Sequence, residues 1–161
     1  PPFFQDADMG SLRYAERLRT RGVAVAAMIS LESLGYYDDA EGSQLYPPGI
    51  AMLYPSTGDF VGFVTNVEHG DLVRRAIETF RAHATIPSEG ASLPGAMPGI
   101  GWSDHWSFWQ IGVPAFMVTD TATFRDPTYH TPRDTPERLD YARMARVVDG
   151  LEPVIEELAG E

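Results

Sequence analysis

The chain has 161 residues, of which 43% are hydrophobic and 22% charged, and 12 Lys and Arg against 23 Asp and Glu give it a formal net charge of −11. This composition is ordinary for a folded globular domain, and the scattered basic residues argue against nucleic acid and anionic membranes as partners, because both need clustered Lys and Arg. The chain has no cysteine, which excludes disulfides, cysteine-bound zinc and thiol nucleophiles, so any metal must be held by His, Asp or Glu.

The first third of the chain predicts one helix, one strand and one long loop. Residues 11–21 form a short amphipathic pattern with Ser11 as its N-cap and a glycine at its end. The run VAVAAMISLES, residues 23–33, is typical of a strand buried on both faces and is expected near the centre of a parallel sheet. Its uninterrupted apolar part is far shorter than a membrane span. Residues 35–58 lack periodicity and predict a surface excursion.

The remaining elements alternate between strands and helices. Two more strands are expected, and so are three helices, the last of which begins with a proline near its first position. A loop of sixteen residues is also expected, a length that hints at function. In chain order these are a strand at 60–66, a helix at 69–84, the loop at 86–101, a short helix at 103–112 capped by Ser103, a strand at 113–121 and a helix at 136–158.

This mixture of buried strands and helices predicts an α/β fold, a three-layer αβα sandwich in which helices cover a mostly parallel central sheet. No repeat, low-complexity tract or linker divides the sequence. Residues 1–161 are therefore expected to form a single unit.

Three places hold side chains that could carry chemistry, each where a strand ends or a loop begins. Glu32 follows the long apolar run, where a carboxylate must reach solvent, hydrogen-bond donors or a cation. Asp104 and His105 are neighbours at the start of a short helix, and for His105 a packed, hydrogen-bonded position is the favoured interpretation. Tyr129 and His130 lie between two prolines, which would hold a ligand or a catalytic group in place.

From residue types alone, these groups make only part of a metal site. A catalytic zinc usually takes three protein ligands and keeps one position for water, whereas Glu32 and His130 are two. A solvated strand end for Glu32 and a surface loop for His130 remain open at this point.

Several segments resemble zinc-dependent aminopeptidases that share a fold with glutaminyl cyclases. The resemblance covers nearly the whole chain and corresponds to the carboxy-terminal half of that family's phosphorylase/hydrolase-like catalytic domain. The segments that carry it are MISLESLGYY, GWSDHWSFWQIGVPAFMVTDT, FRDPTYHTPRDTPERLDY and PPFFQDADMGS, the last of which is similar to the stretch after the family's pair of adjacent glutamates.

The resemblance implies a role for individual residues. Glu32 and His130 would be ligands of a two-zinc centre, Tyr129 would stabilise the oxyanion, and Asp104 would belong to the catalytic hydrogen-bond network. His105 and Asp134 would lie beside these groups and orient them. The side chains expected to shape a pocket for the substrate are Trp102, Trp106 and Phe124, with a place in the core as the alternative.

The resemblance also implies that part of the site is not in this chain. The family pattern has a His, a bridging Asp and the Glu-Glu pair before the segment that PPFFQDADMGS resembles, and no segment here corresponds to them. We therefore expect metal-assisted hydrolysis of amino-terminal peptide bonds by the complete enzyme with two zinc ions, but an inactive fragment here, for which a site without zinc is left open.

Two other functions stay open. One is a non-catalytic binding or assembly module that kept the fold without the metal centre. The other is a glutaminyl cyclase-like acyltransferase. With its first strands missing, the sheet would also expose an edge through which copies of the chain could associate.

Overall fold

The structure, a computed structural model, describes residues 4–160 and contains one sheet of four strands. The strand order is β1-β4-β2-β3, where β1 and β4 pair in parallel, β2 and β3 pair in parallel, and β2 and β4 pair antiparallel. The strands are β1 (Met28–Glu32), β2 (Val61–Asn66), β3 (Ser88–Leu93) and β4 (Ala115–Thr119). The expected α/β fold with a mostly parallel sheet is confirmed.

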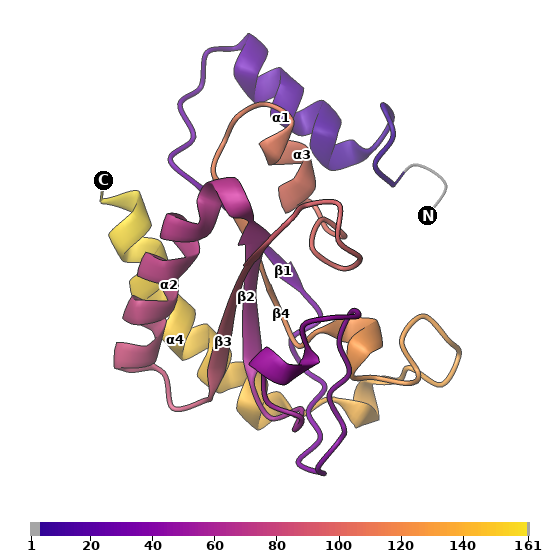
Figure 1. Cartoon of the computed structure of the whole chain (residues 1–161). Coiled ribbons are helices and arrows are strands. Elements are labelled where there is room, and N and C mark those ends of the chain that lie inside the picture. Colours follow the sequence, from indigo (N-terminus) through magenta and orange to yellow (C-terminus); the bar gives the residue numbers. More distant parts are fainter. Residues whose placement is uncertain (1–3, 161) are drawn as a thin grey trace.

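Among the described residues, four α-helices flank the sheet, α1 (Gly10–Thr20), α2 (Gly70–His83), α3 (His105–Trp109) and α4 (Tyr141–Ala159). Two of them, α2 and α4, lie side by side over one face, whereas α1 and α3 lie together at the other end of the molecule (Figure 1). The packing of α3 against β1 and β4 covers part of the opposite face.

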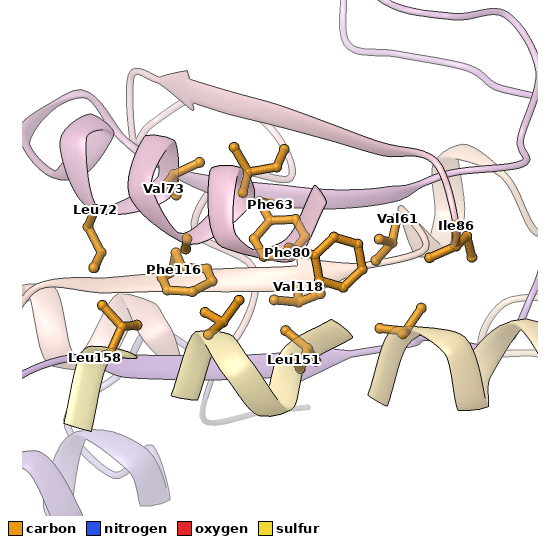
Figure 2. Close-up of a cluster of buried hydrophobic side chains, with 14 residues drawn as sticks. Val61, Phe63, Leu72, Val73, Phe80, Ile86, Phe116, Val118, Leu151 and Leu158 are labelled. Atoms are coloured by element: carbon orange, nitrogen blue, oxygen red, sulfur yellow. The ribbon is translucent and has the colours of Figure 1, made fainter. Parts of the chain in front are cut away.

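The main core lies between the sheet and the α2–α4 pair (Figure 2). Phe63 of β2 is fully buried, and the centroid of its ring lies 4.9 Å from that of Phe80 of α2 and 5.9 Å from that of Phe116 of β4. Burial of each such aromatic side chain contributes about 1.5–3 kcal/mol. Because this core uses the odd positions of β2, the even positions Gly62 and Val64 face the other side, where the candidate site lies.

Three sequence predictions about the strands and helices were wrong. The first strand lies at an edge of the four-stranded sheet and not at its centre, and Leu31 is 59% exposed. The sixteen-residue loop contains β3. The last helix begins later than expected, at Tyr141, because Asp140 caps its first turn and residues 136–138 form a separate 3₁₀ turn.

The two N-cap predictions were also wrong, whereas Gly22 follows the end of α1 as expected. Residue Met9, and not Ser11, precedes α1, and the hydroxyl of Ser11 lies 2.8 Å from that of Ser107 on α3. Ser103 does not cap α3 but donates to Glu32. Residues 1–3 of the segment PPFFQDADMGS lie outside the described residues.

An apolar groove of about 380 Å³ lies between β1 and α4. Leu31 of β1 and Ile155 of α4 are more than half exposed there, at 59% and 54%. Its lining consists of Ala26, Ala27, Ile29, Leu31, Leu151, Ile155, Leu158 and Ala159. Within residues 4–160, none of the helices has the length and apolarity needed to cross a bilayer.

Candidate active site

A cavity of about 110 Å³ lies on the sheet face opposite α2 and α4. All four strands contribute alternate side chains to its floor, because residues two apart on a strand point to the same face. The floor consists of Glu32 of β1, Met117 and Thr119 of β4, Gly62 and Val64 of β2, and Glu89, Ala91 and Leu93 of β3.

Loops from three distant parts of the chain close over this floor. The segment around Leu45 joins the segment after β4, since the Leu45 N–H donates to the Phe124 carbonyl at 2.8 Å. The third segment brings Trp102, whose ring stacks on Phe124 with 6.4 Å between centroids. Both aromatic side chains line the cavity together with Glu32 and Tyr129.

Glu32 is the last residue of β1, and its carboxylate is held by serines. The Ser103 hydroxyl lies 2.9 Å from Oε2 and the Ser33 hydroxyl lies 3.4 Å from Oε1. Ser30, two residues earlier on β1, is buried, and its Oγ lies 2.6 Å from that of Ser103. This chain of hydroxyls links β1 to the start of α3 and fixes the carboxylate at the edge of the cavity.

The loop that carries Tyr129 and His130 is braced by a buried aspartate. Asp126 Oδ1 accepts hydrogen bonds from the N–H of Thr128 at 2.8 Å, from its hydroxyl at 2.7 Å and from Arg138 at 3.1 Å. The carbonyl of Thr128 in turn accepts from the N–H and hydroxyl of Thr131. These hydrogen bonds therefore brace the loop in addition to its two prolines.

His130 occupies a left-handed backbone conformation, with φ 59°. Its ring is exposed and stacks on the Tyr129 ring at 3.9 Å between centroids. Non-glycine residues adopt this conformation only when their surroundings impose it, and such residues are concentrated at functional sites. Ser33, Thr121 and Ala122 share the feature, and each follows the end of β1 or β4 near the cavity.

The Tyr129 hydroxyl stays protonated at neutral pH. Partial burial raises its pKa above the ordinary value, and the negative charges of Glu32, Asp120 and Asp134 raise the pKa further. A protonated phenol can donate a hydrogen bond to an oxygen that gains negative charge during a reaction.

Asp120, directly after β4, fixes the turn that leads into the loop after this strand. Its carboxylate accepts N–H groups of Gly35, Tyr36 and Ala122 at 2.8–3.0 Å. Burial raises the pKa of Asp120 to about 6, although these hydrogen bonds and the charge of Arg125 oppose the shift. The residue thus ties the loop after β1 to the loop after β4.

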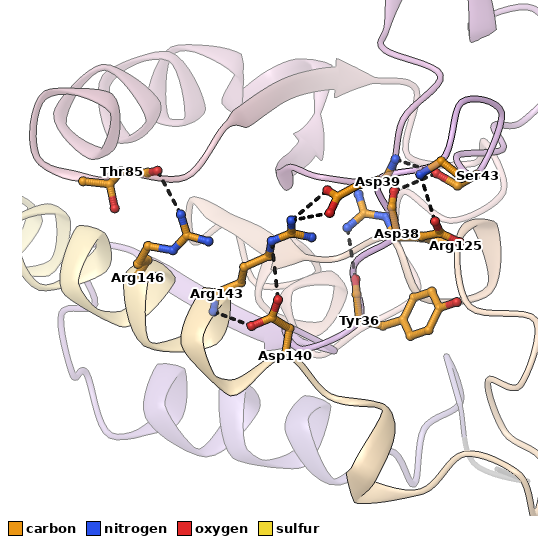
Figure 3. Close-up of polar contacts among 11 residues, drawn as sticks. Tyr36, Asp38, Asp39, Ser43, Thr85, Arg125, Asp140, Arg143 and Arg146 are labelled. Carbon is orange, nitrogen blue, oxygen red and sulfur yellow. Dashed lines mark hydrogen bonds and ion pairs between the residues drawn. The ribbon is translucent and has the colours of Figure 1, made fainter.

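Arg125 and Arg143 hold the long loop 35–58 in place (Figure 3). The buried Arg125 donates to the Tyr36 carbonyl at 3.3 Å and to Gln44 Oε1 at 2.8 Å. From α4, Arg143 donates to both carboxylate oxygens of Asp39 at 2.7 Å. The loop was expected to be an excursion on the surface, but its side chains form part of the cavity wall.

The remaining predicted residues lie away from the cavity lining. Fully buried, His105 has its Nε2 2.7 Å from the Ile100 carbonyl and its ring edge-on to Trp109. Asp104 is exposed before α3, Trp106 is half-buried, and Asp134 is exposed in the loop before α4. None of these four lines the cavity formed by the described residues, and their proposed roles stay predictions.

A complete zinc site is not formed by the part of the chain that the structure describes. Within residues 4–160, no group of three or more His, Asp or Glu side chains is placed to hold a metal ion. Glu32 and His130 have the right chemistry for zinc, but they are fewer than the three ligands that a catalytic zinc usually takes. The donor set present therefore does not fit a zinc ion by itself.

Sequence reasoning missed Ser103, Asp120 and Asp126 as supports of the site. Only Asp126 carries a local signal, because Asp-Pro-Thr is a pattern in which an Asp side chain accepts the N–H two residues later. The contacts of Ser103 and Asp120 cross 71 and 85 residues of chain, to Glu32 and Gly35. They depend on the fold and leave no mark in the local sequence.

Comparison with known sequences connects this site to a family of peptidases. The sequence profile of peptidase family M28 matches residues 8–155. The uncharacterized protein YfbL of Escherichia coli (strain K12) is 43% identical over 152 residues, which cover 94% of this chain and 46% of YfbL. The chain thus spans about half the length of that relative.

Solved structures share the fold at low sequence identity. LapA of Legionella pneumophila has a TM-score of 0.69 and 19% identity, and the match covers 94% of this chain and 37% of LapA. LapB of the same organism has a TM-score of 0.68 and 18% identity, over 92% of this chain and 35% of LapB. An aminopeptidase from Aneurinibacillus sp. strain AM-1 has a TM-score of 0.61 and 19% identity, over 93% of this chain and 30% of the aminopeptidase.

Proposed function

The chain belongs to peptidase family M28, and from this premise we propose that it supplies one side of the active site of a metal-dependent aminopeptidase. The proposed reaction is hydrolysis of the amino-terminal peptide bond of a peptide by metal-activated water. Glu32 and His130 would be two of the metal ligands, and Tyr129 would act on the substrate carbonyl.

The observation that carries the proposal is the position of Glu32 and Tyr129 on one cavity. A carboxylate held by hydroxyl groups and a protonated phenol lie at the same end of an apolar pocket, next to the exposed His130. Trp102 and Phe124 form a wall of that pocket and would contact the substrate side chain. Zinc, when bound, lowers the pKa of its water and polarises a carbonyl.

The proposal places the other metal ligands and the general base outside this chain. Two donors do not hold a catalytic zinc, so residues 1–161 alone would be inactive. The same observation favours a second candidate, a non-catalytic module that keeps the fold and uses the cavity only for binding.

Hydrolysis by two proteins separates these candidates. Aminoacyl p-nitroanilides would be hydrolysed by the full-length protein that contains this chain and not by residues 1–161 alone, with circular dichroism to check that both are folded. A full-length protein that is folded but neither contains zinc nor hydrolyses any of these substrates would favour the binding module.

Association of the isolated chain is a further part of the proposal. The groove between β1 and α4 exposes Leu31 of the edge strand and Ile155 of α4, and edge strands offer unpaired backbone groups to other chains. Residues 1–161 alone would therefore form dimers or larger assemblies, which sedimentation velocity would detect. A strictly monomeric chain at high concentration would contradict this.

A further inference from the structure

Two carboxylates lie at opposite ends of one row of residues across the sheet. Glu32 pairs with Thr119, Thr119 pairs with Gly62, and Gly62 pairs with Glu89. All four line the floor of the cavity. With three steps of about 4.8 Å between neighbouring strands, the Cα atoms of the two glutamates are about 14 Å apart.

The part of the cavity between the two glutamates is apolar. Ile50 and Phe60 line it together with Val64 and Met117 of the floor, and the row itself passes through Gly62, which has no side chain. Such a channel suits the hydrocarbon stem of a long side chain.

The far end of the cavity has the chemistry of a cation site. The Glu89 carboxylate lies there with Tyr46 and Tyr54, whose rings stack with 5.7 Å between centroids. Its negative charge acts on both rings, and it adds to the effect of burial in raising the pKa of each tyrosine. A carboxylate beside aromatic faces favours an ammonium or guanidinium group over a neutral one.

Two arginines near this end do not cancel the charge of Glu89 towards the cavity. The first, Arg81, is 53% exposed and its Nη2 lies 3.9 Å from the Glu89 carboxylate, a distance and exposure at which ion pairs are weak. The second, Arg125, influences Tyr46 but is not part of the lining, and Asp120 opposes its charge. The negative charge of Glu89 is therefore available to a cation inside the cavity.

The geometry points to Glu89 as the residue that selects substrates with an amino-terminal lysine or arginine. This inference rests on the proposed aminopeptidase function, because it places the scissile bond at the Glu32 end of the row. A lysine or arginine side chain reaches about 6–7 Å from its Cα, and the Glu89 side chain extends about 4 Å from its own. Together they bridge most of the row and leave room for the reacting groups above Glu32.

Binding of two matched amides tests the charge preference without any need for catalysis. L-lysinamide and L-norleucinamide differ essentially in the ε-ammonium, and calorimetry on the full-length protein measures their affinities. Lysinamide is expected to bind roughly ten- to a hundredfold more tightly than norleucinamide, and Glu89→Gln should remove most of that difference. The control is Glu68→Gln, because Glu68 is exposed and does not line the cavity; this variant should leave the difference in affinity between the two amides unchanged.

Hydrolysis of aminoacyl p-nitroanilides extends the test to specificity. For the wild type, kcat/KM is expected to be higher for lysine and arginine p-nitroanilides than for those of leucine and norleucine. Glu89→Gln should lower kcat/KM for the basic substrates by about the factor that separates the two amides in binding, and it should leave kcat/KM for the apolar substrates unchanged. Equal binding of the two amides by the wild type, or an unchanged ratio in a folded Glu89→Gln variant, would overturn the inference. If no substrate is hydrolysed while lysinamide still binds through Glu89, the aminopeptidase proposal fails and the cation site stands.

Discussion

Replacement of His105 by glutamine tests whether this histidine is a packed neutral residue and not a metal ligand. Burial lowers the pKa of His105 to about 4. Its Nε2 lies 2.7 Å from the Ile100 carbonyl, so Nε2 carries the proton, and the buried Nδ1 has no hydrogen-bond partner among the described residues. Protonation of Nδ1 would place a charge and an unpaired donor in the interior. Glutamine keeps a donor near the position of Nε2 but does not titrate.

The size of the effect follows from linkage between protonation and folding. An unfolded histidine titrates near 6.5, so the stability that neutral His105 contributes is complete above that pH and is lost as the pH falls towards 4. Between pH 8 and pH 5 the wild type should lose roughly 2 kcal/mol of unfolding free energy through this residue alone.

Urea denaturation of wild type and His105→Gln at pH 8 and pH 5 measures the effect. The unfolding free energy of the wild type minus that of His105→Gln should be roughly 2 kcal/mol lower at pH 5 than at pH 8, since other titrating groups such as Asp120 are common to both proteins. A difference that is the same at both pH values would refute the buried neutral imidazole.

Two further substitutions test the core and the site, each beside a matched control. Gly150→Ala should destabilise the fold by about 1–3 kcal/mol, because a Cβ at this position would lie 2.5 Å from a ring carbon of α2. A Cβ at Gly10 would meet nothing within 4 Å, so the control Gly10→Ala should be neutral or stabilising. The midpoints of urea denaturation measure both effects, and a Gly150→Ala protein as stable as the wild type would contradict the close packing of α2 and α4. In the full-length protein, Tyr129→Phe should lower kcat by a factor of about 10²–10³ with little change in KM, because its hydroxyl would act mainly in the transition state. Tyr14→Phe, at an exposed position, is the control and should leave both kinetic constants unchanged. Equal rates for the two variants would remove Tyr129 from the proposed mechanism.

The helices and the strands β1, β2 and β4 could be predicted because their signals are local. Helix α2 has apolar residues at helical spacing and ends at the predicted place within one residue. The apolar runs of β1 and β4 are equally clear. Glu32 was found as a candidate because a carboxylate after an apolar run must reach solvent, hydrogen-bond donors or a cation, and in the structure it lines the cavity.

Strand β3 could not be predicted because its sequence, SEGASL, has none of the residues that favour strands. Its small residues fit the packing: a Cβ at Gly90 would lie 3.4 Å from Ile77 and 3.6 Å from Val73 of α2. Small size therefore lets the helix approach the strand. Because β3 was missed, Glu89 was missed as well, and with it the far end of the cavity.

The position of β1 at a sheet edge was mispredicted for a different reason. A continuous apolar run indicates burial of both faces of a strand, but it does not reveal whether both edges are paired. The contacts of Asp120 with Gly35 and of Arg125 with Gln44 were likewise out of reach, since they join residues that are 85 and 81 positions apart along the chain.

The central claim is that His130 belongs to a metal site used for hydrolysis. The most direct test measures zinc per chain and hydrolysis of aminoacyl p-nitroanilides in the full-length protein and its His130→Ala variant, with His83→Ala, an exposed residue of α2, as the control. We expect His130→Ala to lose bound zinc and more than about a hundredfold in rate, and His83→Ala to keep both. A His130→Ala protein that retains its zinc and its activity would contradict the account.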